Sequence, residues 1–245
     1  MSEPEESVIA FDSATDGVAV GLARAGEVLA ETLAGADAGE RPRHASVLLE
    51  AIEAAVEAGG GWERVGRIGI GVGPGSYTGM RIGIATGRAL AQARELPAVG
   101  VGTLTALALG IAGRAEARGR VCLAVGDARR SEIFAQLHDD RGTPLSDPAV
   151  LAPDRLAGWL AEIGGKPLSN GVERPLAAGS GALRFARELE VAGVKVLPAG
   201  DPAHRLAPRH LCTLTAEGAG VAPSEIRPVY LREPDAKRWL ERDRS

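Results

Sequence analysis

Hydrophobic and polar positions in the first half of the chain predict short strands that alternate with longer helices. Short apolar runs bounded by turn residues are typical of buried strands, whereas apolar residues three and four apart are typical of helices. The predicted strands are 7–12, 18–23, 27–33, 68–72 and 97–101. The predicted helices are 44–58, 77–95 and 103–117.

The second half repeats the order of elements in the first. Its predicted strands are 121–125, 132–137, 148–151, 176–178 and 194–197. Its predicted helices are 154–163, 182–190 and 208–218. Each half contains three strands, followed by helix, strand, helix, strand and helix. This recurrence predicts two similar α/β units joined near residues 105–118.

The composition is that of a globular protein and favours the cytoplasm. Of the 245 residues, 45% are hydrophobic, and the net charge is −4. No apolar run reaches the roughly 18 residues of a membrane span, and the acidic start MSEPEES lacks the basic region of a secretory signal. The two cysteines, Cys122 and Cys212, are far apart, which favours a reducing compartment. The negative charge argues against unaided binding to nucleic acid.

The glycine-rich stretch GVGPGSYTGMRIGIATGRALA at residues 71–91 fits neither common phosphate-binding motif. No lysine follows its glycines, as a P-loop requires, and the dinucleotide spacing Gly-x-Gly-x-x-Gly does not occur. Amides and hydroxyls at a helix start can still bind an anion, although a plain strand-to-helix turn is equally compatible with the sequence. The candidate nucleotide or anion turn comprises Asp12, Ser13, Gly73, Pro74, Gly75, Ser76 and Thr78.

A row of glycines follows that turn. Gly79, Gly83 and Gly87 recur at every fourth residue of the predicted helix. Each glycine inside a helix costs roughly 0.5–1 kcal/mol relative to alanine, so the row needs a reason. Residues four apart share one helix face, and a face without side chains allows another backbone to approach closely. That backbone belongs either to this chain's own sheet or to a helix of another subunit.

Metal-binding and catalytic motifs are missing from the sequence. The four histidines are His44, His138, His204 and His210, and no two are four residues apart. Neither cysteine lies in a CxxC pair, so no metal site is expected. Asp12 ends the first strand, where it could position a metal-bound nucleotide or simply form a turn. The charged turn at residues 127–132 holds the matching place in the second half.

The glycine stretch closely resembles the signature of the TsaB (YeaZ) family, bacterial partner subunits in tRNA threonylcarbamoyladenosine synthesis. The other matching segments, in family order, are VIAFDSATDGVAVGLARAGEVLAE, RPRHASVLLEAIEAAV, VGVGTLTALALGIA, AVGDARRSEIFAQL and RPVYLREPDA. These segments are spread along nearly the whole chain, from residue 8 to residue 236. The sequence departs from the family at Ser13, where threonine is common, at Tyr77, which replaces phenylalanine, and after His44, where Ala-Ser stands.

The resemblance implies an actin-like, Hsp70-like ATPase (ASKHA) fold made of two tandem RNase H-like units, each with a mixed sheet flanked by helices. The expected domains are 1–110, 111–226 and a C-terminal tail at 227–245. The resemblance also implies a non-catalytic scaffold or activator of TsaD, the subunit that transfers the threonylcarbamoyl group to an adenosine of tRNA, working with the ATPase TsaE. TsaD holds its metal with paired histidines on a helix, and this sequence has no such pair.

The family pairs through its first two helices, either with itself or with TsaD. By this resemblance the expected interface residues are His44, Val47, Leu48, Ala51, Gly79, Met80, Gly83 and Gly87. Gly83→Leu would then break pairing and leave the fold largely intact. We expect no cofactor of the chain's own, with ATP or ADP as the candidate ligand at the interface with TsaD, and tRNA contacts only within the complex.

Two other activities are alternatives to this interpretation. An independent actin-like ATPase or small-molecule kinase would use Asp12 and the turn at 73–78, and its nucleotide turnover would be lost in Asp12→Ala. A peptidase is disfavoured because the metal-binding pair of TsaD is missing. The mixed tail could assist tRNA binding within a complex through its cations Lys237, Arg238, Arg242 and Arg244.

Overall fold

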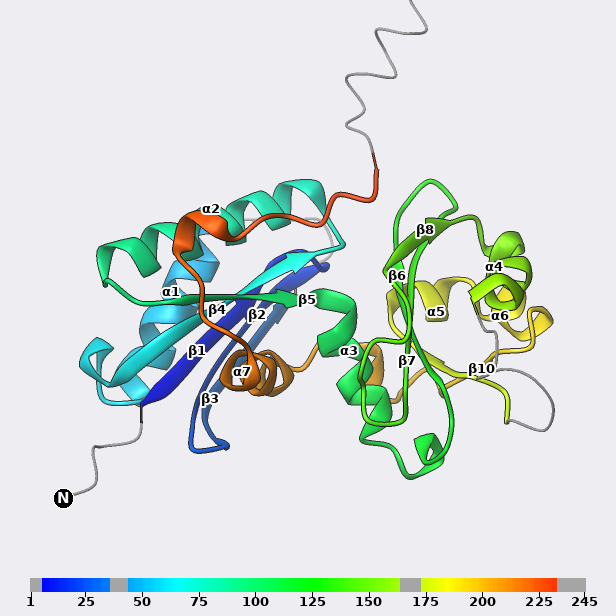
Figure 1. The fold of residues 1–245 in the computed structure, drawn as a ribbon, viewed down its shortest axis with the longest axis horizontal. Coiled ribbons are helices and arrows are strands. Elements are labelled where there is room, and N and C mark those ends of the chain that lie inside the picture. Colours follow the sequence, from blue (N-terminus) through cyan, green and yellow to red (C-terminus); the bar gives the residue numbers. More distant parts are fainter. Residues whose placement is uncertain (1–5, 36–43, 164–172, 233–245) are drawn as a thin grey trace, which may run out of the picture.

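The computed structural model describes residues 6–35, 44–163 and 173–232, which form two five-stranded sheets (Figure 1). The first sheet has the order β3-β2-β1-β4-β5. Its strands are β1 (Ser7–Asp12), β2 (Gly17–Arg24), β3 (Glu27–Gly35), β4 (Val65–Gly73) and β5 (Ala98–Gly102). On one side, β1 pairs antiparallel with β2, and β2 pairs antiparallel with β3. On the other side, β1 pairs parallel with β4, and β4 pairs parallel with β5.

The second sheet repeats this topology, with the order β10-β9-β6-β7-β8. Its strands are β6 (Cys122–Asp127), β7 (Ile133–His138), β8 (Ala149–Leu151), β9 (Leu176–Ala178) and β10 (Lys195–Val196). The central strand β6 pairs antiparallel with β7 and parallel with β9, as β1 does with β2 and β4. Two copies of this mixed sheet in tandem form the actin-like fold, which confirms the predicted fold class.

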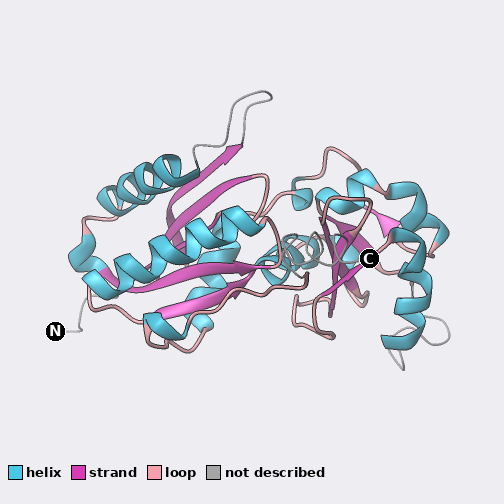
Figure 2. Ribbon diagram, turned by 90° about the horizontal axis from the view of Figure 1, so that it is seen from above, coloured by secondary structure: helices cyan, strands magenta, loops and turns pink. Residues whose placement is uncertain are grey.

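Helices cover both sheets (Figure 2). The α-helices are α1 (His44–Ala58), α2 (Tyr77–Ala93), α3 (Thr103–Ala112), α4 (Leu156–Ile163), α5 (Ser180–Arg184), α6 (Ala186–Val191) and α7 (Pro208–Glu217). Single 3-10 turns are η1 (Trp62–Arg64), η2 (Ala115–Ala117), η3 (Pro153–Arg155), η4 (Pro202–His204) and η5 (Pro223–Glu225). Within the described ranges, no helix is both long enough and apolar enough to cross a membrane.

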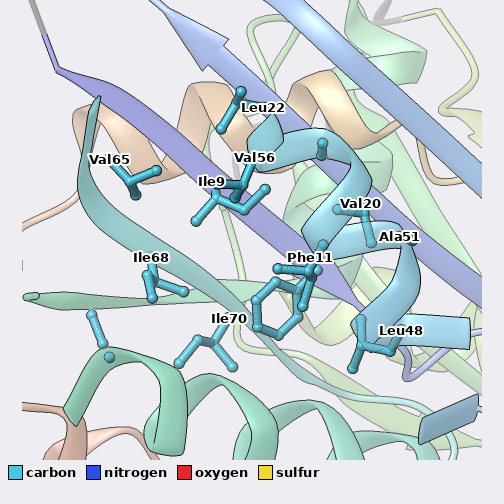
Figure 3. Packing of buried hydrophobic residues seen from close by; sticks show 14 of the residues in the cluster. Ile9, Phe11, Val20, Leu22, Leu48, Ala51, Val56, Val65, Ile68 and Ile70 are labelled. Atoms are coloured by element: carbon cyan, nitrogen blue, oxygen red, sulfur yellow. The ribbon is translucent and has the colours of Figure 1, made fainter. Parts of the chain in front are cut away.

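Alternation along β1 gives the first sheet two different packed faces. Ile9 and Phe11 point toward α1 and α2, where they meet Leu48 in a core that excludes water (Figure 3). Each such side chain contributes about 1.5–3 kcal/mol on burial. Ala10 lies between them and points to the opposite face, where the small side chain leaves room for Leu211 of α7. The large residues therefore anchor α1 and α2, and the small ones admit α7.

The structure differs from the predicted elements in three places. The helix predicted at 182–190 is broken at Phe185, whose φ of −118° and ψ of 32° are not helical. The helix predicted at 103–117 ends at Ala112. The helix at the end of the predicted second unit, α7, packs on the first sheet, where Cys212 lies against Ala10 and Ala19. The domain boundaries at 110 and 226 stay a prediction.

Candidate functional site

The loop after β1 and the turn after β4 lie together, as the sequence predicted, because the two strands are parallel neighbours. The Ser76 amide donates a hydrogen bond of 2.7 Å to the carbonyl of Ala14. Gly73 has a positive φ of 89°. A Cβ at Gly75 would collide with the Ala14 carbonyl. The glycines of this turn therefore permit a backbone path that runs directly over the β1 loop.

The Asp12 carboxylate is buried and fully engaged by this chain's own groups. It accepts a hydrogen bond of 2.7 Å from the Ala14 amide and one of 2.5 Å from the Thr103 hydroxyl. Burial raises the pKa of Asp12, and these hydrogen bonds oppose the rise. Thr103 is the first residue of α3, so Asp12 fastens that helix to the end of β1. The role of Asp12 in positioning a metal-bound nucleotide stays a prediction.

The hydroxyls of the turn divide into engaged and exposed groups. The Ser13 hydroxyl is buried and donates a hydrogen bond of 2.8 Å to the Gly79 carbonyl. Ser76 caps the N-terminus of α2 by accepting a hydrogen bond of 3.3 Å from the Gly79 amide. Ser76 and Thr78 are exposed at the helix start. The turn is thus a structural joint between β1, β4 and α2.

The glycine row of α2 packs on this chain's own sheet. A Cβ at Gly79 would collide with the Ser13 carbonyl, and a Cβ at Gly83 would lie 2.6 Å from the Ser13 hydroxyl oxygen. A Cβ at Gly87 would lie 2.5 Å from a terminal carbon of Ile70. The three glycines face this chain's own sheet and not a partner, which corrects the expected interface. The prediction that Gly83→Leu spares the fold is replaced by the prediction that it disturbs the packing of α2 on Ser13.

The other predicted interface residues are also mostly internal. Leu48 and Ala51 belong to the core beneath α1, and Val47 is half-buried against it. Met80 is buried, and its sulfur fills the space beside Gly73. Side chains so placed stabilise the monomer and do not present a surface for a partner. His44 begins α1, but its side chain lies outside the described residues.

The outward sides of α1 and α2 carry exposed small and apolar residues that were not among the predicted interface residues. The two helices pack side by side on one face of the first sheet. Ala85 and Ala89 are exposed on α2, two residues out of phase with the glycine row. Leu49, which is 43% exposed on α1, is a large apolar side chain in solvent. The signal in the sequence was this second row of small residues, also spaced by four.

The second unit has a matching aspartate at the end of its central strand. Asp127 accepts hydrogen bonds of 2.8 Å from the Arg129 amide and from the Arg184 guanidinium. Arg129 also reaches Asp16 of the first unit at 2.6 Å. Like Asp12, Asp127 is therefore engaged by groups of the same chain.

The turn after Asp127 is strained. Arg129, Arg130 and Ser131 have φ values of 61°, 51° and 59°. Three consecutive non-glycine residues in the left-handed region cost on the order of 1 kcal/mol each, and such strain persists only where other contacts hold it. The charged turn at 127–132 is therefore exposed at residues 129–131 but held in a defined backbone conformation.

The histidines do not gather into a site. His204 is buried and accepts a hydrogen bond of 3.1 Å from the Gly179 amide, while its other ring nitrogen lies 3.1 Å from the Leu197 carbonyl. Within residues 6–35, 44–163 and 173–232, no three histidine, cysteine, aspartate or glutamate side chains are placed to hold a metal ion. The basic tail residues Lys237, Arg238, Arg242 and Arg244 lie outside the described residues.

The sequence of this chain is similar to a family model and to known proteins. Residues 40–195 match the family model described as "TsaD: tRNA N6-adenosine threonylcarbamoyltransferase". The chain is 31% identical to the tRNA threonylcarbamoyladenosine biosynthesis protein TsaB of Escherichia coli (strain K12), over 92% of this chain and 94% of that protein.

Two solved structures from Pseudomonas aeruginosa share the fold. YeaZ is 25% identical, with a TM-score of 0.72 over 92% of this chain and all of that chain. A second structure, described as an uncharacterized protein with similarity to peptidase YeaZ, is also 25% identical, with a TM-score of 0.73 over 93% of this chain and all of that chain.

Proposed function

The chain belongs to the TsaB family of tRNA threonylcarbamoyladenosine biosynthesis proteins, and on that premise we propose that it is a non-catalytic subunit that binds and activates TsaD. The observation that carries the proposal is the state of the two strand-end aspartates. Asp12 and Asp127 occupy equivalent places in the two units. Asp12 accepts hydrogen bonds from an amide and a hydroxyl of this chain, and Asp127 accepts them from an amide and a guanidinium. These internal hydrogen bonds support a structural role for both carboxylates over the binding of a metal-bound phosphate.

The outward surface of α1 and α2 is the proposed docking face for TsaD, and for a second copy when the chain is alone. Leu49, Ala85 and Ala89 give this face one large apolar group and a shallow row where a helix can lie close. Binding there would activate TsaD only if the chain binds its competent conformation more tightly than the others. TsaE, and ATP or ADP at the shared interface, belong to the assembled complex in this proposal.

The same proposal assigns tRNA contact to the complex and not to this subunit alone. The chain carries a net charge of −4, whereas unaided binding to the phosphate backbone relies on clustered cations. In this proposal the subunit recognises another protein, TsaD, in the cytoplasm.

Reconstitution tests the proposed function. Threonylcarbamoyl transfer to tRNA would be measured with purified TsaD, TsaE and TsaC, a further protein of the same synthesis, with and without this chain. We expect modification to depend on the chain, while the chain alone hydrolyses no ATP above background. ATP turnover by the isolated chain that disappears in Asp12→Ala would instead establish the independent ATPase or kinase.

Ala85→Glu tests the docking face. Ala85 is exposed on α2, so the change is expected to alter the free energy of unfolding by less than about 0.5 kcal/mol. A charge buried at an interface without a partner is costly, so affinity for TsaD should fall roughly tenfold or more. Titration of TsaD with each variant measures it. Ala157→Glu, the same change on exposed α4, is the control and should bind normally. Equal affinities for the two variants would remove α2 from the interface.

A further inference from the structure

The stretch Ile226–Arg232, which overlaps the first six residues of the family-like segment RPVYLREPDA, runs from the first unit to the second (Figure 1). Ile226 is buried in the core of the first unit. The Val229 amide donates a hydrogen bond of 2.9 Å to the Val72 carbonyl of β4. The ring of Tyr230 then lies 5.3 Å from that of Tyr77, between centroids, at the start of α2. These contacts fix the stretch to the first unit.

The last two residues of the same stretch fix it to the second unit. Leu231 packs against a cluster that includes Phe134 of β7. The Arg232 guanidinium donates hydrogen bonds of 2.7 Å to the Ala128 carbonyl and 3.3 Å to the Arg129 carbonyl, and it forms an ion pair with Glu132. Hydrogen bonds from a guanidinium are stronger than neutral ones, and this guanidinium is partly withdrawn from solvent.

Arg232 thus holds the strained turn that itself reaches back to the first unit. Its guanidinium donates to the consecutive carbonyls of Ala128 and Arg129, at the entry to the left-handed residues. The Arg129 side chain extends from that turn to Asp16. The Asp16–Arg129 pair alone is too exposed to contribute much. The turn at 128–132 therefore carries two connections between the units: the Asp16–Arg129 ion pair and the contacts of Arg232.

We propose that Ile226–Arg232 is a strap that sets the orientation of the second unit relative to α2, and that this orientation tunes binding at the docking face. The second part rests on the proposed function. Side chains in contact connect the strap to the docking face. Tyr230 of the strap contacts the ring of Tyr77. Arg81 of α2 lies over the same ring and donates a hydrogen bond of 2.9 Å to the Tyr77 hydroxyl. Arg81 is exposed on α2 one turn before Ala85. A partner on this face would lie beside Arg81, which is linked through Tyr77 to Tyr230 of the strap.

Distances between the units test the strap itself. Spin labels at Glu57→Cys on α1 and Val191→Cys on α6 report the distance between units, since both positions are exposed and the native cysteines are buried. In the full chain, Arg232→Ala should broaden the distance distribution or shift its maximum. Tyr230→Ala, which removes an exposed ring, should act in the same direction. Arg227→Ala is the control, because the Arg227 guanidinium donates to the neighbouring carbonyls of Ser224 and Ile226, and its loss should leave the distribution unchanged.

A distribution for Arg232→Ala and Tyr230→Ala that matches the parent would overturn the strap, as would an equal change in Arg227→Ala. Titration of TsaD with the same variants tests the coupling. Arg232→Ala and Tyr230→Ala should weaken binding roughly tenfold, and Arg227→Ala should not. Normal binding by both strap variants would overturn the coupling. If the parent chain itself fails to bind TsaD, the proposed function fails, and the distance measurement still decides whether the strap exists.

Discussion

Gly79→Ala is expected to lower the free energy of unfolding by about 3 kcal/mol, the largest effect in the glycine row of α2. The added Cβ would overlap the carbonyl oxygen of Ser13, a backbone atom. That backbone cannot withdraw easily, because the Ser13 hydroxyl is bonded to Gly79 and the neighbouring Ala14 carbonyl accepts from Ser76. Urea unfolding of each variant at neutral pH measures the change.

The rest of the row provides graded controls for this prediction. At Gly87 a Cβ would lie 2.5 and 2.6 Å from two carbons of Ile70 and 3.0 Å from the Phe11 ring, but these are side-chain and not backbone atoms, and alanine in a helix recovers about 1 kcal/mol of propensity. Gly87→Ala should therefore destabilise less than Gly79→Ala, and Gly83→Ala should destabilise least, since it displaces only the Ser13 hydroxyl. If all three variants folded normally and lost only partner binding, the row would face a partner after all.

Acidification from pH 7 to pH 4 is expected to remove about 3 kcal/mol of stability through His138 alone. Burial lowers the pKa of His138 from 6.5 to about 4. Its Nδ1 lies 3.2 Å from the Gln136 carbonyl, and its Nε2 is buried with no hydrogen-bond partner in the described part of the chain. Its cross-strand neighbour Cys122, whose pKa burial raises to about 12, stays neutral. No nearby thiolate therefore compensates a charged imidazole.

The sign follows from which state takes up the proton. Above pH 6.5 His138 is neutral in both states and its contribution does not vary with pH. Between pH 6.5 and 4 the unfolded chain binds a proton that the folded chain refuses, so the free energy of unfolding falls. Asp12 acts in the opposite direction, because its pKa is raised in the folded state and its protonation favours folding.

The difference between the parent and His138→Gln isolates the histidine, since Asp12 is common to both. Urea unfolding at pH 7 and pH 4.5 should show a much larger loss in the parent than in the variant. His210 also has a pKa lowered by burial and will leave a remaining acid sensitivity in both proteins. Equal losses in parent and variant would show that His138 does not carry the effect.

Local pattern predicted the elements of this fold because most of them bury one clear face. The alternation of Ile9, Ala10 and Phe11 marks a strand with two packed sides, and β1 begins and ends at the predicted residues. The meeting of Asp12 with the turn at 73–78 was also predictable, since both follow parallel neighbours. What could not be read locally is the destination of α7, because its apolar residues would suit either sheet.

The site shows the same division between what spacing determines and what it leaves open. Spacing by four identified the shared face of Gly79, Gly83 and Gly87 but not the surface that meets it. The strap at Ile226–Arg232 was recognisable as a motif, yet its contacts join residues about a hundred positions apart in sequence, such as Arg232 with Ala128. No periodicity in a single sequence encodes such pairings.

The return of α7 to the first sheet has a consequence for synthesis on the ribosome. The chain emerges N-terminus first, and the strands β1 to β5 are complete long before Pro208–Glu217 is made. Until then, the face of the first sheet lined by Ala10 and Ala19 has no cover from α7. The first unit therefore finishes folding only after the second unit has been translated, although its own strands are synthesised first.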